Sequence, residues 1–229
     1  MEVSKPRLLD LFCCEGGAAT GYHAAGFDVT GIDLSPQPRY PFSFIQCDAL
    51  EYVAAHGHEY DAIHASPPCQ RYSATLRTKG DRNIHPDLIA PTRAALKGVG
   101  RPWVMENVEG AKREMIHPAL LCGSMFGLHV RRHRLFESSF VLLVPDCVHD
   151  VELQRPQVYQ STTQRDGTKP LRGIVNAHAT GARWNSDALA KAMAVEWMSP
   201  HGAREAIPPV YTEFIGHQLL AQVVRTLAA

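Results

Sequence analysis

A cysteine in a proline-rich turn is the first group in the sequence that could do covalent chemistry. Residues 60–65 are predicted to form a buried strand, which runs directly into Ser66-Pro67-Pro68-Cys69-Gln70. The two prolines fix the chain in an extended or turned form. They would present Cys69 at the carboxyl end of a sheet, where open α/β folds place their active sites. The thiol becomes a nucleophile if its thiolate is stabilised. A single cysteine is more often a small buried apolar side chain, but the flanking prolines and polar residues make that interpretation less attractive here.

A carboxyl group and an amide follow a second apolar strand. Residues 102–108 read Pro-Trp-Val-Met-Glu-Asn-Val, so the predicted strand ends at Glu106 and Asn107. A carboxyl at a strand end in a site of low dielectric would have a raised pKa and could donate a proton. The other reading of the Glu-Asn pair is an exposed turn.

Two arginines alternate in the stretch Arg131-Arg132-His133-Arg134. Alternate residues of an extended segment point the same way, so Arg132 and Arg134 are expected to share a face. Such a pair can hold a carboxylate, a phosphate or a base carbonyl.

A glycine-containing turn near the N-terminus could bind a nucleotide-like ligand. Residues 10–17 read Asp-Leu-Phe-Cys-Cys-Glu-Gly-Gly and follow an apolar strand, and glycine lets a ligand approach the backbone closely. Asp33, at the end of the next strand, is placed to accept from ribose hydroxyls. Asp48, after a third strand, could accept from an adenine amino group. Taken alone, the turn could also be only a tight turn.

The elements that must position these groups alternate between strands and helices. Strands are predicted over residues 7–12, 27–33, 44–48, 60–65, 102–106 and 135–144, and helices over 18–25, about 49–55, 86–96, 187–198 and 213–227. This order predicts an α/β fold with a mostly parallel, doubly wound sheet and helices on both faces. Residues from about 145 to 186 have no clear period. They indicate a small insertion, taken as 141–186, between two parts of a catalytic domain, 1–140 and 187–229.

Composition limits the class of protein. The 229 residues suit one domain with a modest insertion, and no apolar run approaches the roughly 18–20 residues of a membrane helix. With no secretory signal at the N-terminus, the expected location is the cytoplasm of a bacterial cell or phage-infected host. Net charge is zero, but residues 71–101 hold seven Lys/Arg and two acids, which is a candidate backbone-contacting patch or simply a solvated face. The six cysteines do not resemble a disulfide framework.

The order of these segments resembles the DNA cytosine carbon-5 methyltransferase family. Residues 10–17, with Gly21 and Ala25-Gly26-Phe27, look like its first motif, and Ser66-Pro67-Pro68-Cys69-Gln70 looks like its catalytic loop. Glu106-Asn107-Val108 matches its Glu-Asn-Val motif, and Arg132-x-Arg134 matches the end of its Gln-x-Arg-x-Arg motif. Residues 206–216 resemble its C-terminal motif. The resemblance covers about residues 7–140 and 187–229.

The resemblance implies a Rossmann-like fold, the cofactor S-adenosylmethionine (AdoMet) and double-stranded DNA as partner. Cys69 would attack carbon 6 of a flipped-out cytosine, and Glu106 would contact the ring nitrogen and exocyclic amine. Asn107 would position the loop, Arg132 would hold the base carbonyl or backbone, and Arg134 would support it. The implied cofactor-binding residues are Asp10, Phe12, Cys14, Gly16, Gly17, Asp33, Leu34, Asp48, Ala49 and Pro68. The basic loop 71–82 is a candidate for closing on DNA.

Three positions depart from the family pattern. Cys14 stands where the first motif usually has glycine, and Val130 stands where the glutamine of Gln-x-Arg-x-Arg is expected. The presumed target-recognition region, 141–186, is short, so sequence readout would be limited or would need a second subunit.

Other functions remain open at this stage. A tRNA cytosine methyltransferase, an AdoMet-dependent enzyme acting on a free nucleotide and an inactive DNA-binding relative would share these motifs, although intact Cys69 and Glu106 argue against the last. A zinc site could use Cys147 and His149 with His129 or His133, but the spacing matches no standard pattern, and no metal is expected. Oligomeric state is not predicted.

Overall fold

The computed structural model describes residues 4–73, 84–128, 130–149, 175–176 and 186–227. The strands are β1 (Arg7–Leu11), β2 (Asp28–Asp33), β3 (Ser43–Gln46), β4 (Ala62–Ala65), β5 (Trp103–Asn107), β6 (Ala119–Leu121), β7 (Val130–Arg131), β8 (Arg134–Ser138) and β9 (Val175–Asn176). The α-helices are α1 (Gly17–Ala24), α2 (Ala49–His56), α3 (Ile89–Val99), α4 (Ser186–Ala192), α5 (Pro200–Glu205) and α6 (Pro209–Leu227). Short 3₁₀ turns include η2 (Gln70–Tyr72), η5 (Glu109–Ala111) and η6 (Gly123–Phe126).

The main sheet has seven strands in the order β3-β2-β1-β4-β5-β8-β6. The first five are parallel, whereas β8 runs antiparallel to both β5 and β6. The strand order reverses between β1 and β4, and ligands of open α/β sheets bind at such a switch point, beyond the carboxyl ends of the strands. The predicted α/β class with a mostly parallel sheet is confirmed.

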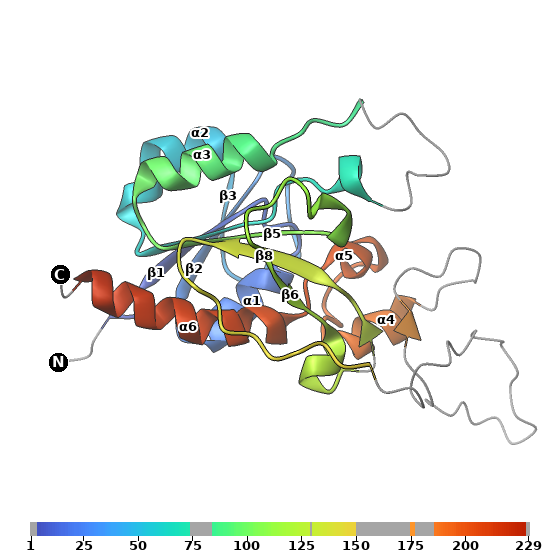
Figure 1. Cartoon of the computed structure of the whole chain (residues 1–229). Coiled ribbons are helices and arrows are strands. Elements are labelled where there is room, and N and C mark those ends of the chain that lie inside the picture. Colours follow the sequence, from blue (N-terminus) through green and yellow to red (C-terminus); the bar gives the residue numbers. More distant parts are fainter. Residues whose placement is uncertain (1–3, 74–83, 129, 150–174, 177–185, 228–229) are drawn as a thin grey trace, which may run out of the picture.

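Alternate residues of the central strands face two separate cores. Leu9, Ile63 and Met105 pack on the side of α2 and α3, whereas Leu8 and Val104 pack on the side of α1 and α6. Helices therefore cover both faces of the sheet (Figure 1). This two-fold alternation is what a strand buried on both faces requires.

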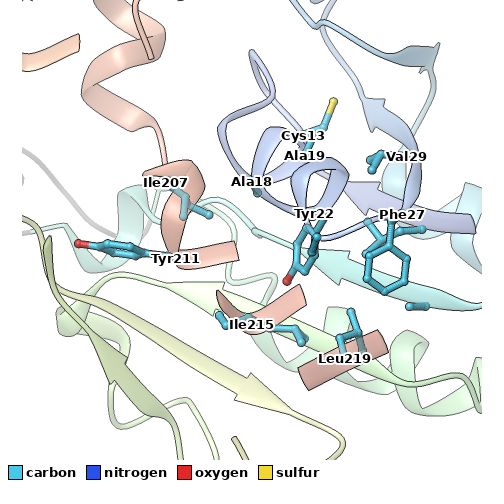
Figure 2. Packing of buried hydrophobic residues seen from close by; sticks show 14 of the residues in the cluster. Cys13, Ala18, Ala19, Tyr22, Phe27, Val29, Ile207, Tyr211, Ile215 and Leu219 are labelled. Atoms are coloured by element: carbon cyan, nitrogen blue, oxygen red, sulfur yellow. The ribbon is translucent and has the colours of Figure 1, made fainter. Parts of the chain in front are cut away.

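Helix α6 crosses α1 at very close range. A Cβ atom on Gly21 would lie 2.0 Å from the Pro209 carbonyl oxygen and 2.2 Å from Thr212 Oγ1, so only glycine fits there. Around this contact, Tyr22 of α1 and Ile215 and Leu219 of α6 form one apolar cluster (Figure 2). This contact packs a helix near the start of the described chain against the helix at its end, within one hydrophobic core.

Several element boundaries differ from the prediction. The strand predicted over 135–144 ends at Ser138, and the helix predicted over 187–198 ends at Ala192, just before Ala194 takes a left-handed backbone (φ 56°). Helix α3 begins at Ile89, which puts Pro91 in the first turn, where its missing N–H is not needed. Helix α6 begins four residues earlier than predicted, at Pro209. Most of the predicted insertion and most of the basic loop 71–82 lie outside the described residues.

Candidate active site

A cleft opens at the switch point between β1 and β4. It is partly open to solvent, and its empty space, including that open part, is about 670 Å³. It is lined by residues 10, 12–15, 17, 18, 66–70, 106, 108, 134, 198, 202 and 205–207. The cleft therefore brings together the glycine-rich turn, the proline-cysteine loop, the end of β5, the start of β8 and the chain around α5.

Cys69 lies in the wall of this cleft at the N-terminal cap of η2. The turn is closed by the N–H groups of Tyr72 and Ser73, which both donate to the Cys69 carbonyl. Burial and the nearby Glu106 carboxylate raise the pKa of the Cys69 thiol, while Arg134 opposes that rise. The thiolate is therefore disfavoured as long as Glu106 carries a negative charge.

Glu106 and Arg134 form a buried ion pair in the same cleft. Arg134 Nε lies 2.9 Å from Glu106 Oε1, and both side chains are nearly inaccessible to solvent. Burial raises the pKa of Glu106, although Arg134, Arg132 and the Ser66 hydroxyl act against the rise. Burial therefore favours the protonated carboxyl, whereas the ion pair with Arg134 favours the carboxylate.

Asn107 holds the loop that carries Cys69. Its Nδ2 donates to the Pro67 carbonyl oxygen at 3.0 Å, and its Oδ1 accepts from the Val108 N–H at 2.9 Å. Asn107 does not line the cleft itself. It is thus a positioning residue, tied to the backbone two residues before the thiol.

Arg132 is buried on the side of α5 and α6 and does not line the cleft. Its Nη2 donates to the Arg204 carbonyl at 2.7 Å, and its own carbonyl accepts from the Tyr211 hydroxyl at 2.7 Å. Burial and the neighbouring Arg134 lower the pKa of Arg132 to about 9. Arg132 therefore links the turn between β7 and β8 to α5 and α6, whereas Arg134 lines the cleft.

A chain of polar groups behind Glu106 was not anticipated from the sequence. Tyr22 Oη lies 2.9 Å from His64 Nδ1, and His64 Nε2 lies 2.9 Å from Ser66 Oγ, which in turn reaches Glu106. Burial lowers the pKa of His64 to about 3, so the ring is neutral. The only sequence signal was the period of two, which puts Asp10, His64 and Glu106 on the same face of the sheet.

The predicted cofactor residues divide into two groups. Asp10, Phe12, Cys14, Gly17 and Pro68 line the cleft. The others lie beside it: Gly16 in the turn, and Asp33, Leu34, Asp48 and Ala49 at the carboxyl ends of β2 and β3.

The backbone of the glycine-rich turn is strained at Cys14, which stands where the first motif of the family usually has glycine. Cys14 has φ 46°, in the left-handed region where glycine is favoured, and its N–H donates to Asp33 Oδ2 at 3.0 Å. Asp33 also accepts from the Ser35 N–H, and Asp48 caps α2 by accepting from two backbone N–H groups. Asp33 and Asp48 therefore both stabilise the local backbone, in addition to any contact with a ligand.

Glu15 connects the turn to the C-terminal part of the chain, a contact that sequence reasoning missed. Its carboxylate accepts from the Ser199 N–H and hydroxyl, and its carbonyl accepts from Trp197 Nε1. Ala206 and Ile207, from the motif expected to return to the cofactor pocket, line the cleft together with Glu205. The only feature of the sequence that pointed to Glu15 was its position in a turn already expected to bind a ligand.

Known proteins share this architecture. No family model matches the chain. Over 124 residues the chain is 27% identical to the type II methyltransferase M.XorII of Xanthomonas oryzae, a match that spans 47% of this chain and 29% of that protein's length.

Three solved structures have the same fold over 96% of the chain. They are a putative DNA modification methyltransferase encoded within an E. coli prophage (TM-score 0.61, 14% identity), the S. pombe Dnmt2 methyltransferase (0.59, 12%) and the Entamoeba histolytica methyltransferase EhMeth (0.57, 10%). Each is itself covered over 99% of its length. The expected Rossmann-like methyltransferase fold is confirmed. In fold and in the order of its motifs, the chain resembles the cytosine carbon-5 methyltransferases. Among the helices of the described residues, none is both long and apolar enough to span a membrane.

Proposed function

We propose that the chain is a DNA (cytosine-5-)-methyltransferase that acts through a covalent Cys69 adduct. The observation that carries the proposal is the meeting of Cys69, Glu106 and Arg134 in one cleft with the glycine-rich turn. A thiol, a proton-holding carboxyl and a fixed guanidinium are the groups that activation of a cytosine ring requires.

Carbon 5 of cytosine is a poor nucleophile until carbon 6 is attacked. In the proposed mechanism the Cys69 thiolate adds to carbon 6 while Glu106, in its protonated form, donates to the ring nitrogen. Protonation of Glu106 also removes the negative charge that raises the pKa of Cys69, so one proton favours both steps. Arg134 keeps the carboxyl in place. Carbon 5, made nucleophilic by this addition, would then take a methyl group, and loss of its proton to water would expel Cys69 and restore the ring.

AdoMet is the proposed cofactor, and the chemistry of the cleft lining supports this choice. Asp10 lines it with a fully buried carboxyl whose Oδ1 has no hydrogen-bond partner among the described residues, which suits a ligand with N–H or O–H donors. Phe12, Gly17 and Pro68 would hold the ligand in the cleft, and the acids at the ends of β2 and β3 would take its ribose and adenine. When bound, AdoMet supplies the electrophilic methyl group.

A mechanism-based trap tests the nucleophile. A duplex with 5-fluorocytosine at the target position cannot lose fluorine as a cation, so it should hold the enzyme as a denaturation-resistant adduct when AdoMet is present. Cys69→Ser should abolish the adduct, because a hydroxyl supplies almost no anion near neutral pH. Cys47→Ser, which changes a partly buried thiol outside the cleft, is the matched control. An adduct that persists in Cys69→Ser, or that maps to another cysteine, would refute the mechanism.

Duplex DNA is the proposed substrate, and its target cytosine must leave the stack to reach the cleft, at a cost of a few kcal/mol. Methyl incorporation into duplex DNA, tRNA and free cytidine nucleotides, measured side by side, tests this choice. Bisulfite sequencing of DNA from an expressing host then gives the target sequence. Incorporation into tRNA or nucleotides alone would replace the DNA proposal.

Sequence choice is assigned to residues 141–186, most of which lie outside the described residues. Substitution of Arg155, Arg165 or Arg172 should alter the methylated sites or weaken DNA binding while AdoMet affinity stays the same. If none of the three changes either property, the recognition function belongs elsewhere.

Isothermal titration tests the cofactor site. Asp33→Ala should weaken AdoMet binding at least about tenfold, which is about 1.4 kcal/mol. Asp28→Ala, at the opposite end of β2, is the matched control and should bind as the wild type does. Equal affinity in both variants would show that the ribose contact is assigned wrongly.

A further inference from the structure

Four potential metal ligands gather outside the cleft. Cys122, His133, Cys147 and His149 each offer one atom, and these four atoms all lie within 4.8 Å of one another. Cys122 caps η6, His133 lies between β7 and β8, and the other two follow β8. None of the four lines the cleft. The cluster is therefore separate from the proposed catalytic machinery.

Hydrogen bonding cannot satisfy this arrangement. His149 Nε2 lies 3.2 Å from Cys147 Sγ, 3.4 Å from Cys122 Sγ and 3.3 Å from His133 Nε2. A ring nitrogen carries either one proton or one lone pair, so it can form one good hydrogen bond among these contacts. A cation in the centre would instead accept a lone pair from all four atoms at once.

Four of the six separations between the ligand atoms are close to those of a tetrahedral zinc site. Bond lengths of about 2.3 Å to sulfur and about 2.0–2.1 Å to nitrogen place neighbouring ligand atoms about 3.3–3.8 Å apart in a tetrahedron. The sulfur–nitrogen contacts are 3.2, 3.4 and 3.5 Å, and the nitrogen–nitrogen contact is 3.3 Å. Two thiolates also neutralise the charge of a divalent cation. Four protein ligands leave no open position, which is typical of structural and not of catalytic zinc.

A carboxylate supports one of the ligands from behind. Glu109 Oε1 lies 3.0 Å from His133 Nδ1, on the side of the ring away from the cluster. Zinc-bound histidines usually donate their second N–H to such a carboxylate, which fixes the tautomer and the ring orientation. With Nδ1 engaged, Nε2 is the atom left to face the other three ligands.

We propose that Cys122, His133, Cys147 and His149 bind one structural zinc ion. The ion would clamp the chain after β8, where it leads toward residues 150–174, onto the segment between β7 and β8. His133 lies between Arg132 and Arg134, so the clamp would also fix the strand that aims Arg134 at Glu106. The proposal is independent of the proposed methyl transfer. It opposes the expectation from sequence that no metal binds.

The sequence suggested three of these four ligands, one of them only as an alternative. Cys147 and His149 were candidate ligands with His133 as one option, while His129, the other option, lies outside the described residues. Cys122 was not considered for the site, because it lies far upstream and becomes a neighbour only when β6 pairs with β8.

Metal analysis of tag-free protein tests the proposal. Protein purified without chelators should contain about one zinc per chain. Cys147→Ser and His149→Ala should lose it on dialysis, and Cys47→Ser should keep it. Both ligand changes lie at partly exposed positions, so they keep the test valid even if the buried Cys122→Ser variant fails to fold.

Two further measurements separate a tetrahedral thiolate site from adventitious binding. Reconstitution with Co²⁺ should give intense visible d–d bands and a thiolate charge-transfer band, both lost in Cys147→Ser. Glu109→Gln should still bind one zinc but with affinity lowered about 10–100-fold. Wild-type protein that takes up neither metal, or ligand variants that retain a full equivalent of zinc, would overturn the proposal.

Discussion

Replacing Asn107 with alanine should loosen the loop that carries Cys69. The fully buried amide satisfies two backbone groups, the carbonyl of Pro67 and the N–H of Val108. Each hydrogen bond contributes about 1 kcal/mol, and each buried group left without a partner costs about 1–3 kcal/mol. The free energy of unfolding should therefore fall by about 2–4 kcal/mol in urea denaturation.

Asn107→Asp separates loop positioning from simple loss of packing. The carboxylate has the same shape and can still accept from Val108, but it turns an oxygen instead of an N–H toward the Pro67 carbonyl. Adduct formation with the 5-fluorocytosine duplex should slow at least about tenfold, equivalent to about 1.4 kcal/mol. AdoMet affinity should stay near the wild-type value. If both variants form the adduct at the wild-type rate, Asn107 does not position the thiol.

Three other substitutions probe the frame around the cleft. Gly21→Ala should destabilise the protein by about 1–3 kcal/mol or more, because the added methyl group collides with the backbone of α6. The methyl group of Gly98→Ala meets no atom within 4 Å, so this control should be neutral or stabilising. Equal effects of the two substitutions in chemical denaturation would contradict the packing argument. Arg93→Ala should lower the free energy of unfolding by about 3–5 kcal/mol, because it removes the cation that binds the buried Glu137 carboxylate through two nitrogens. An unchanged midpoint of urea denaturation would refute this expectation. Burial raises the pKa of Asp10 from 3.8 to about 8, so the unfolded chain ionises first and the wild type loses stability as pH rises through this window. Relative to wild type without ligand, Asp10→Asn should therefore gain at least about 1 kcal/mol between about pH 5 and pH 7.5, and a constant difference would show that Asp10 is ionised in the folded protein.

The sequence predicted the five parallel strands of the sheet, because β1, β4 and β5 are largely apolar segments that end at turn signals, although β2 and β3 are more polar. It did not predict β6 or α5, which have three and six residues and are too short to show a period. It also could not place the antiparallel pairing of β8, which depends on tertiary contacts. For the site, motif order singled out Cys69, Glu106 and Arg134, which the structure brings together. The structure turns Arg132 toward α5, and it adds His64 and Glu15, whose roles depend on neighbours distant in the sequence.

The close crossing of α1 and α6 has a consequence for biosynthesis. Helix α1 ends at Ala24 and α6 begins at Pro209. Translation at about 5–20 residues per second takes about 10–40 s to cross that interval. Throughout it, the side of α1 that packs on α6 stays uncovered, and the wall of the cleft that Glu15 anchors through Ser199 has not yet been made. A nascent chain can therefore complete this wall of the cleft only after α5 has left the ribosome. Chains that stop before α6 would expose the α1 surface that α6 covers to chaperones and proteases.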